Sequence, residues 1–367
     1  MRILFRTVLW STALFAALVG TVLASTMFGS VSLDAGTVVR AMLNTLAYPS
    51  DVGLDSGQVG VGEHTAGVPV PDVSYTQPLS FDVDRTDQII VEKVRLPRIV
   101  LGAVVGFALG TAGAVMQGFF KNPMADPSII GVSSGAAVGA VATIAFPVTM
   151  PFGLQTAAFV GAILAAFGVY FIATQGGRTP VATLLLAGLA VQTFLGAGVS
   201  YLLLNAGEGL EEAILWLMGR LSYGNWGDVG STLPFVLLLF VVLLTYARDL
   251  NVMLLGEEDA HALGIDVERT KRLLLAASAL VTAAAVAVAG IIGFVGLIIP
   301  HIMRLIVGPD HRILIPTSAL AGATFLVLAD TLARAGPGPA MPVGIVTAAV
   351  GAPFFLFLLR RREVHAL

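Results

Sequence analysis

The chain lacks cysteine altogether and contains few histidines and lysines. The absence of cysteine excludes disulfides, iron–sulfur clusters, thiolate metal sites and a cysteine nucleophile. No Gly-Lys dipeptide occurs, so the chain has no phosphate-cradling loop and does not hydrolyse nucleotide by that route. The histidines show no metal-ligand spacing: His64, His261, His301, His311 and His365. We therefore expect no metal site, no catalytic residues and no cofactor held by this chain.

Charged residues are also scarce, at 12% of 367 residues, whereas hydrophobic residues make up 56% and the mean hydropathy is +0.89. A soluble domain has about a quarter of its residues charged. The apolar residues form runs long enough to cross about 30 Å of hydrocarbon as helices, and porin-type alternation is absent. The composition predicts an all-α polytopic membrane protein in contact with lipid, with no nucleic-acid partner.

The apolar runs predict ten transmembrane helices in one domain, residues 1–367. The expected spans are 7–28, 97–117, 127–146, 152–174, 181–204, 229–247, 271–289, 291–307, 314–333 and 341–360. A cleaved signal peptide is the alternative for the first run. In this count the basic clusters fall on one side of the membrane. We therefore expect a protein of the cell membrane with both termini on the cytoplasmic side. Residues 208–226 are expected to form an external re-entrant or surface helix.

Residues 29–94 form a polar segment between the first two spans. It is rich in glycine, proline, serine and aspartate, and holds nine acidic residues against three basic ones. This charge balance suits an extracytoplasmic loop. Residues 50–80 offer almost nothing to bury, so we expect this acidic insert to be flexible.

Glycines recur every four residues on the second and third spans. One series is Gly102, Gly106 and Gly110, and the other is Gly131, Gly135 and Gly139. Such series let transmembrane helices approach closely, so both spans are expected inside the bundle. Between them Asn122-Pro123 and Asp126-Pro127 break the helix on the cytoplasmic side.

Residues 248–272 form the only long charged segment in the second half of the chain. A short helix is predicted over 256–263, with acidic residues in its first turn and Gly264 as its stop. Asp266 is positioned to cap a second helix that enters the next span. Composition by itself favours a solvated loop. The alternative is a rigid surface that another protein moves, since Leu254, Leu255, Ala260 and Leu263 are apolar.

The spans carry no paired carboxylates or histidines of the kind that ion-coupled carriers need. The exception is Asp330 with Arg334, one helical turn apart at the external end of the ninth span, where an ordinary intrahelical ion pair is an equal alternative. A self-contained secondary transporter or channel is therefore disfavoured, and an intramembrane hydrolase lacks a catalytic pair. The bundle needs energy from elsewhere.

Several motifs from Arg95 onward, in this order and spacing, resemble the FecCD family of permease subunits of type II ABC importers. They are RLPR, MQGFFKNPMADPSIIGVSSGA, LLLAG, LWLMG, LLGEEDAHALGI, GFVGLIIPHIMRLIVGPDHR, LADTLAR and PVGIVTAAVGAPFFLFLL. The resemblance does not extend to the acidic loop. Within the family the motifs look nearest to those of cobalamin permeases, with iron-siderophore and haem import left open.

The resemblance implies a non-enzymatic permease that works as a homodimer. Its partners are two separate ATPase subunits, which carry ATP and magnesium, and an extracytoplasmic substrate-binding protein. Asn122 and Met124 match a cytoplasmic gate, and Arg95, Arg98 and Arg334 match arginines that dock the binding protein. From the residues alone, Arg95 and Arg98 are interfacial anchors. The residues matching ATPase-coupling helices are Leu254, Leu255, Gly256, Glu257, Glu258, Ala260, Leu263 and Gly264.

Overall fold

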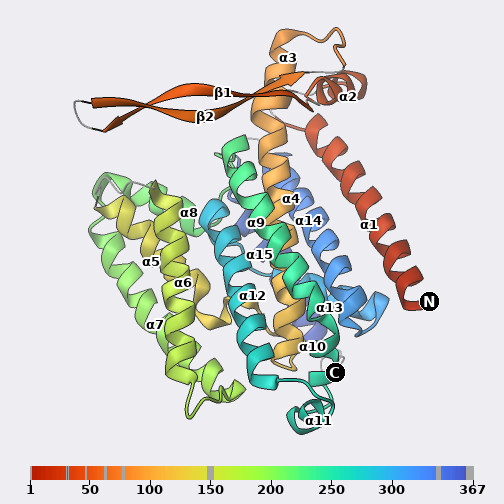
Figure 1. The fold of residues 1–367 in the computed structure, drawn as a ribbon, viewed down its shortest axis with the longest axis vertical. Coiled ribbons are helices and arrows are strands. Elements are labelled where there is room, and N and C mark those ends of the chain that lie inside the picture. Colours follow the sequence, from red (N-terminus) through yellow and green to blue (C-terminus); the bar gives the residue numbers. More distant parts are fainter. Residues whose placement is uncertain are drawn as a thin grey trace.

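The structure of the chain is a computed structural model. It describes residues 2–29, 31, 33–45, 48–61, 64–76, 79–146, 153–335 and 340–360, with the backbone alone at residue 2, within 48–76 and at 358–359. In these ranges the chain is a bundle of apolar helices (Figure 1). A two-stranded ribbon lies at one end of the bundle and a pair of short helices, α10 and α11, lies at the other.

Ten apolar helices form the bundle of the described residues. They are α1 (Arg2–Met27), α4 (Leu96–Phe119), α5 (Val132–Ala145), α6 (Gly153–Ala173), α7 (Val181–Leu204), α9 (Trp226–Thr245), α12 (Val267–Ala289), α13 (Val295–Val307), α14 (His311–Ala335) and α15 (Val343–Arg360). Seven are long and apolar enough to cross a membrane, and α5, α13 and α15 are shorter apolar helices. Each falls on one of the ten predicted spans, so the fold class is confirmed.

The remaining helical elements are short. They are α2 (Ala35–Asn44), α3 (Arg85–Ile89), a π-helical segment Ile90–Arg95, 3-10 turns Pro127–Ile130 and Gly207–Gly209, α8 (Leu210–Leu217), α10 (Ala247–Met253) and α11 (Glu257–Ala262). The helix expected within 208–226 is thus α8, which at 8 residues is too short to span.

The acidic loop contains an antiparallel ribbon of β1 (Tyr48–Val61) and β2 (His64–Thr76). The sequence indicated no regular structure here. Side chains of this ribbon lie outside the described part of the chain, so the flexibility of the insert stays a prediction. Around it, Asn44 joins the two ends of the loop, since its amide donates to the Phe81 carbonyl at 3.0 Å and accepts from Phe81 N at 2.7 Å.

Helix α4 runs through the centre of the bundle, with most of its residues buried. Its glycines face neighbouring backbones: a Cβ on Gly106 would collide with the Gly322 carbonyl of α14, and one on Gly110 with the Ser318 carbonyl. A Cβ on Gly113 would meet the Gly296 carbonyl of α13. The predicted close approach is confirmed at Gly106 and Gly110, and α4 extends it by one more turn, whereas Gly102 faces only the Leu221 side chain.

The second glycine series joins α5 to α6. A Cβ on Gly135 would collide with the Gly161 carbonyl, and one on Gly139 with the Ala157 carbonyl. Both pairs bring the helix backbones close together, which confirms the predicted approach at Gly135 and Gly139. Gly131 precedes α5 and faces side chains instead of backbone.

Two of the predicted spans begin with irregular backbone. The span expected over 127–146 starts with a 3-10 turn and Gly131 at φ 85°, so α5 begins at Val132. The span expected over 291–307 starts with an extended turn that ends at Phe294, a residue with φ 69°. The two irregular turns pack together, because Pro127 lies against Gly296. Non-helical backbone at these depths is tolerated because it is covered by protein.

Candidate functional site

In the charged segment 248–272, the predicted short helix is α11 and the predicted helix after Asp266 is the start of α12, while α10 was not predicted. Helix α11 begins after Gly256, at φ 140°, and the chain turns again at Gly264, at φ 85°. Asp266 caps α12 by accepting from Arg269 N at 3.1 Å. The acidic residues expected in the first turn of α11 are in place, where the helix dipole favours them.

Two leucines of this segment project outward. Leu255 is 67% exposed and Leu263 is 64% exposed, beside exposed Glu257 and Glu258. Leu254 is half-buried. Large apolar side chains on a charged helical surface are typical of a surface that a partner covers.

Ala260 is not on the exposed surface formed by these leucines. The expectation that its side chain contacts a partner together with them is therefore wrong. Ala260 is fully buried, at 0% exposure, because the chain folds back over it: Ile265 N donates to the Ala260 carbonyl at 3.0 Å. A six-residue helix has one side against the bundle, and Ala260 lies on that side.

Lys271 fixes α11 to α12. Its side chain is buried, and its ammonium lies 2.6 Å from Glu257 and 3.3 Å from Glu268. Two carboxylates compensate the charge of the buried lysine. Helix α11 is therefore held by an ion pair as well as by Ala260.

The residues predicted to form a cytoplasmic gate lie in the turn that follows α4. Asn122 is exposed and its side-chain oxygen accepts from Met124 N at 2.9 Å, which holds the turn before Pro127. Asn122 N in turn donates to the Gln117 carbonyl at 3.0 Å. Met124 is half-buried. The turn is thus a hydrogen-bonded continuation of α4.

The three arginines predicted for docking lie at the other end of the bundle, and two of them share one carboxylate. Asp330, with 1% side-chain exposure, lies 2.7 Å from Arg98 on α4 and 2.9 Å from Arg334 on its own helix. Arg334 also donates to Ser25 Oγ at 2.7 Å and to the Phe28 carbonyl at 3.0 Å. The predicted Asp330–Arg334 pair is confirmed, and the structure adds Arg98.

Arg95 is placed differently from the expectation of an external arginine. It is 5% exposed, and its guanidinium donates to the backbone carbonyls of Thr26, at 2.6 Å, and of Val31. Thr26 lies in the last turn of α1 and Val31 follows its end, so Arg95 ties the end of α1 and the start of the acidic loop to the N-terminus of α4. The expectation that Arg95 is free for docking is therefore wrong, because both of its terminal guanidinium nitrogens are hydrogen-bonded within the chain.

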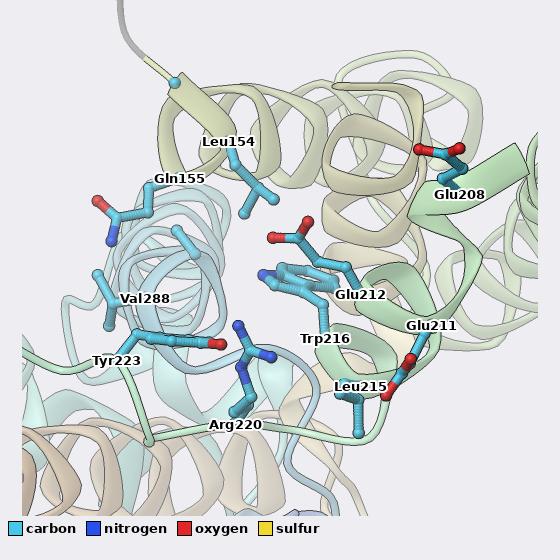
Figure 2. A pocket seen from close by; sticks show the side chains of 12 residues that line it. Leu154, Gln155, Glu208, Glu211, Glu212, Leu215, Trp216, Arg220, Tyr223 and Val288 are labelled. Atoms are coloured by element: carbon cyan, nitrogen blue, oxygen red, sulfur yellow. The ribbon is translucent and has the colours of Figure 1, made fainter. Parts of the chain in front are cut away.

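A cavity of about 700 Å³ opens beside α8, at the end of the bundle that carries the arginines. Figure 2 shows Glu212, Trp216, Arg220 and Tyr223 converging on it from α8 and the following loop, with Gln155 of α6 and Val288 of α12 opposite. The Arg220 guanidinium lies 3.6 Å from the centre of the Tyr223 ring. Sequence reasoning singled out 208–226 as a surface helix but had no signal for the walls that α6 and α12 supply.

The fold and these sites define a class: a polytopic α-helical membrane protein with a glycine-packed centre, a charged helical surface at one end and buried arginines at the other. The model of the FecCD transport family matches residues 14–361. The chain belongs to the FecCD transport family.

Similar proteins support this assignment. The chain is 56% identical over 364 residues to the cobalamin import system permease protein BtuC of Halobacterium salinarum, covering 99% of this chain and 98% of the relative. It is 43% identical to the hemin transport system permease protein HmuU of Yersinia pestis, covering 74% of this chain and 83% of the relative. A solved metal-chelate type ABC transporter in an inward-facing conformation matches with a TM-score of 0.76 and 31% identity, covering 96% and 98% of the two chains.

Proposed function

We propose that this chain is the permease subunit of an ATP-driven importer that takes up cobalamin. One observation carries the substrate: the 56% identity to a cobalamin import permease extends over 99% of the chain, whereas the match to the hemin permease covers 74%. The alignment with the cobalamin permease includes the acidic loop. A likeness of this extent favours a shared substrate and shared partners, and not only a shared fold.

The energy for transport enters through a separate pair of ATPase subunits, which bind ATP and magnesium. The chain itself has no nucleotide-binding loop. The exposed Leu255 and Leu263 on and beside α11 support this contact, with Glu257 and Glu258 at its edge. Burial of two leucines on a partner contributes roughly 3 to 6 kcal/mol before the costs of association.

The end of the bundle that carries α10 and α11 is assigned to the cytoplasm. Basic residues gather there, as the positive-inside rule requires. The beginning of α1 lies at the same end, because the Arg6 guanidinium donates to the Val307 carbonyl at 2.9 Å. Helix α15 starts at the opposite end, where Gly344 packs on the Met218 carbonyl, so it also ends on the cytoplasmic side.

Transport is assigned to a twofold homodimer, in which the two gate turns meet at the cytoplasmic mouth. Asn122 and Met124 then close or open the pathway as the helices tilt. Displacement of α10 and α11 by the ATPase subunits drives the change. The hydrogen-bonded continuity of α4 with the gate turn supports such a transfer of motion.

An extracytoplasmic binding protein delivers cobalamin to the outer end. Arg98 and Arg334 are assigned to its docking surface, with acidic side chains of the partner as their counterparts. Their shared carboxylate leaves one positive charge in excess, which supports attraction of an acidic partner. Arg95 is buried by contacts within the chain, so its part in docking is to hold the loop in place.

The test is uptake in vesicles that contain the permease, its ATPase and its binding protein. Radiolabelled cyanocobalamin, haem and a ferric siderophore are offered singly and in competition. We expect ATP-dependent accumulation of cyanocobalamin that the other two do not displace. Uptake of haem or siderophore alone overturns the substrate, and uptake driven by an ion gradient without ATPase overturns the class.

A further inference from the structure

Asn251 lies on helix α10 and binds the turn between α13 and α14. Its amide nitrogen donates to Asp310 Oδ1 at 2.8 Å. Its amide oxygen accepts from His311 N at 2.9 Å and lies 2.7 Å from His311 Nδ1. One assignment satisfies all three contacts: the amide nitrogen of Asn251 faces the Asp310 carboxylate, and the backbone N and the ring Nδ1 of His311 both donate to the amide oxygen.

The turn that Asn251 binds is well defined. Asp310 also accepts from Arg312 at 2.6 Å, and hydrogen bonds from Arg312, with that from Asn251, lower the pKa of Asp310 to about 2. The carboxylate is therefore ionised at neutral pH. His311 is 1% exposed, so its contacts with Asn251 are shielded from water.

A third element meets the same point. The imidazole of His311 packs on Gly118 of α4 so closely that a Cβ there would collide with Nε2. Leu250, the neighbour of Asn251 and fully buried, also lies against Gly118, at 3.1 Å from a Cβ built there. Gly118 stands four residues before Asn122, inside the hydrogen-bonded turn: Lys121 N donates to its carbonyl at 3.1 Å.

We propose that Asn251 is a positioning residue for energy coupling, which joins the α10–α11 segment to α14 and, through His311 on Gly118, to the gate turn. This rests on the proposed function, in which an ATPase displaces α10 and α11. Without the Asn251 contacts, α10 is held to α14 and α4 by apolar packing alone, which permits sliding. The directional hydrogen bonds make the three elements move as one body.

The experiment exchanges the two partners of the key hydrogen bond. N251D keeps the acceptor for His311 but sets a second carboxylate against Asp310, and like charges at that distance repel. D310N keeps an acceptor for Asn251, because its amide turns to present oxygen. The double variant N251D/D310N restores a donor–acceptor pair with reversed polarity. R312Q is the matched control, since it removes the side-chain hydrogen bonds of Arg312 to Asp310 and leaves both the backbone hydrogen bond from residue 312 and Asn251 untouched.

The measurement is cyanocobalamin taken up per ATP hydrolysed in vesicles, together with co-purification of the ATPase. We expect N251D to keep its ATPase and hydrolyse ATP while uptake per ATP falls roughly tenfold, the effect of losing one hydrogen bond to a charged group. D310N, R312Q and the double variant should remain near the parent. A merely structural role predicts equal losses of hydrolysis and uptake and no rescue.

Parent-like uptake per ATP in N251D, or no recovery in the double variant, overturns the proposal. If N251D does not assemble, N251A removes the same bonds without adding charge, and parent-like coupling in N251A overturns it equally. The parent is measured first, and absence of ATP-driven uptake by the parent overturns the proposed function and this inference together. If the parent transports and the Asn251 variants are coupled equally well, only this inference is overturned.

Discussion

At Asp330 a single buried carboxylate serves two arginines from different helices. Arg98 comes from α4, and Arg334 comes from the next turn of α14. A buried group of ion pairs adds little to the free energy of folding compared with apolar packing of the same volume. Removing one of its charged side chains, however, leaves a buried charge without compensation. The arrangement therefore holds α1, α4 and α14 in one relative position at this end of the bundle, since Arg334 also binds two groups at the end of α1.

We expect D330N to destabilise the fold by about 3 kcal/mol, because it leaves two arginines facing each other without a carboxylate. The measurement is the urea midpoint of the detergent-solubilised protein. D259N on exposed α11 is the control and should unfold with the parent. A D330N protein as stable as the parent would show that water or lipid compensates the arginines.

At the scale of elements, α4 is held by backbone contacts on its glycine series. We expect G106A to destabilise the bundle by about 2 kcal/mol, because the added methyl group collides with the Gly322 carbonyl and α14 must move away. G168A on α6 is the matched control, since nothing lies within 4 Å of a Cβ there. The melting temperatures of the two variants are measured in detergent. Equal melting temperatures for G106A and G168A would contradict the close approach of α4 and α14.

For α11 we expect L263E to abolish ATPase association or to uncouple hydrolysis from uptake. The charge would have to be buried without a partner, at a cost of about 2 kcal/mol or more. Co-purification and vesicle uptake measure the two effects. R178E, on the exposed α6–α7 loop of the same end, controls for added negative charge. If L263E transports like the parent, the leucine does not contact the ATPase.

At the scale of the whole molecule, the gate proposal depends on a twofold dimer. The chain contains no cysteine, so M124C introduces a single thiol per subunit. We expect M124C to form a disulfide between subunits in one nucleotide state only, as the helices tilt between two arrangements. R178C provides the comparison on the same side of the membrane. Cross-linking independent of nucleotide, or none at all, would remove Met124 from the gate.

The sequence by itself determined the membrane class, the ten helices and the two glycine series. These depend on local properties: the length of apolar runs, the spacing of small residues and the helix breaks at Pro123 and Pro127. It also determined α11 and the cap at Asp266, because both follow from short-range signals. Residues far apart in sequence played no part in these predictions.

Only the tertiary structure decided which side chains are available to partners. Arg95 and Ala260 belong to motifs that predict contact with partners, yet both are buried, Arg95 by carbonyls at the end of α1 and Ala260 by the chain that returns at Ile265. The pairing of Arg98 with Asp330 and the contacts of Asn251 with His311 join positions 232 and 60 residues apart. No local pattern encodes these contacts, because they arise from the packing of whole helices against one another.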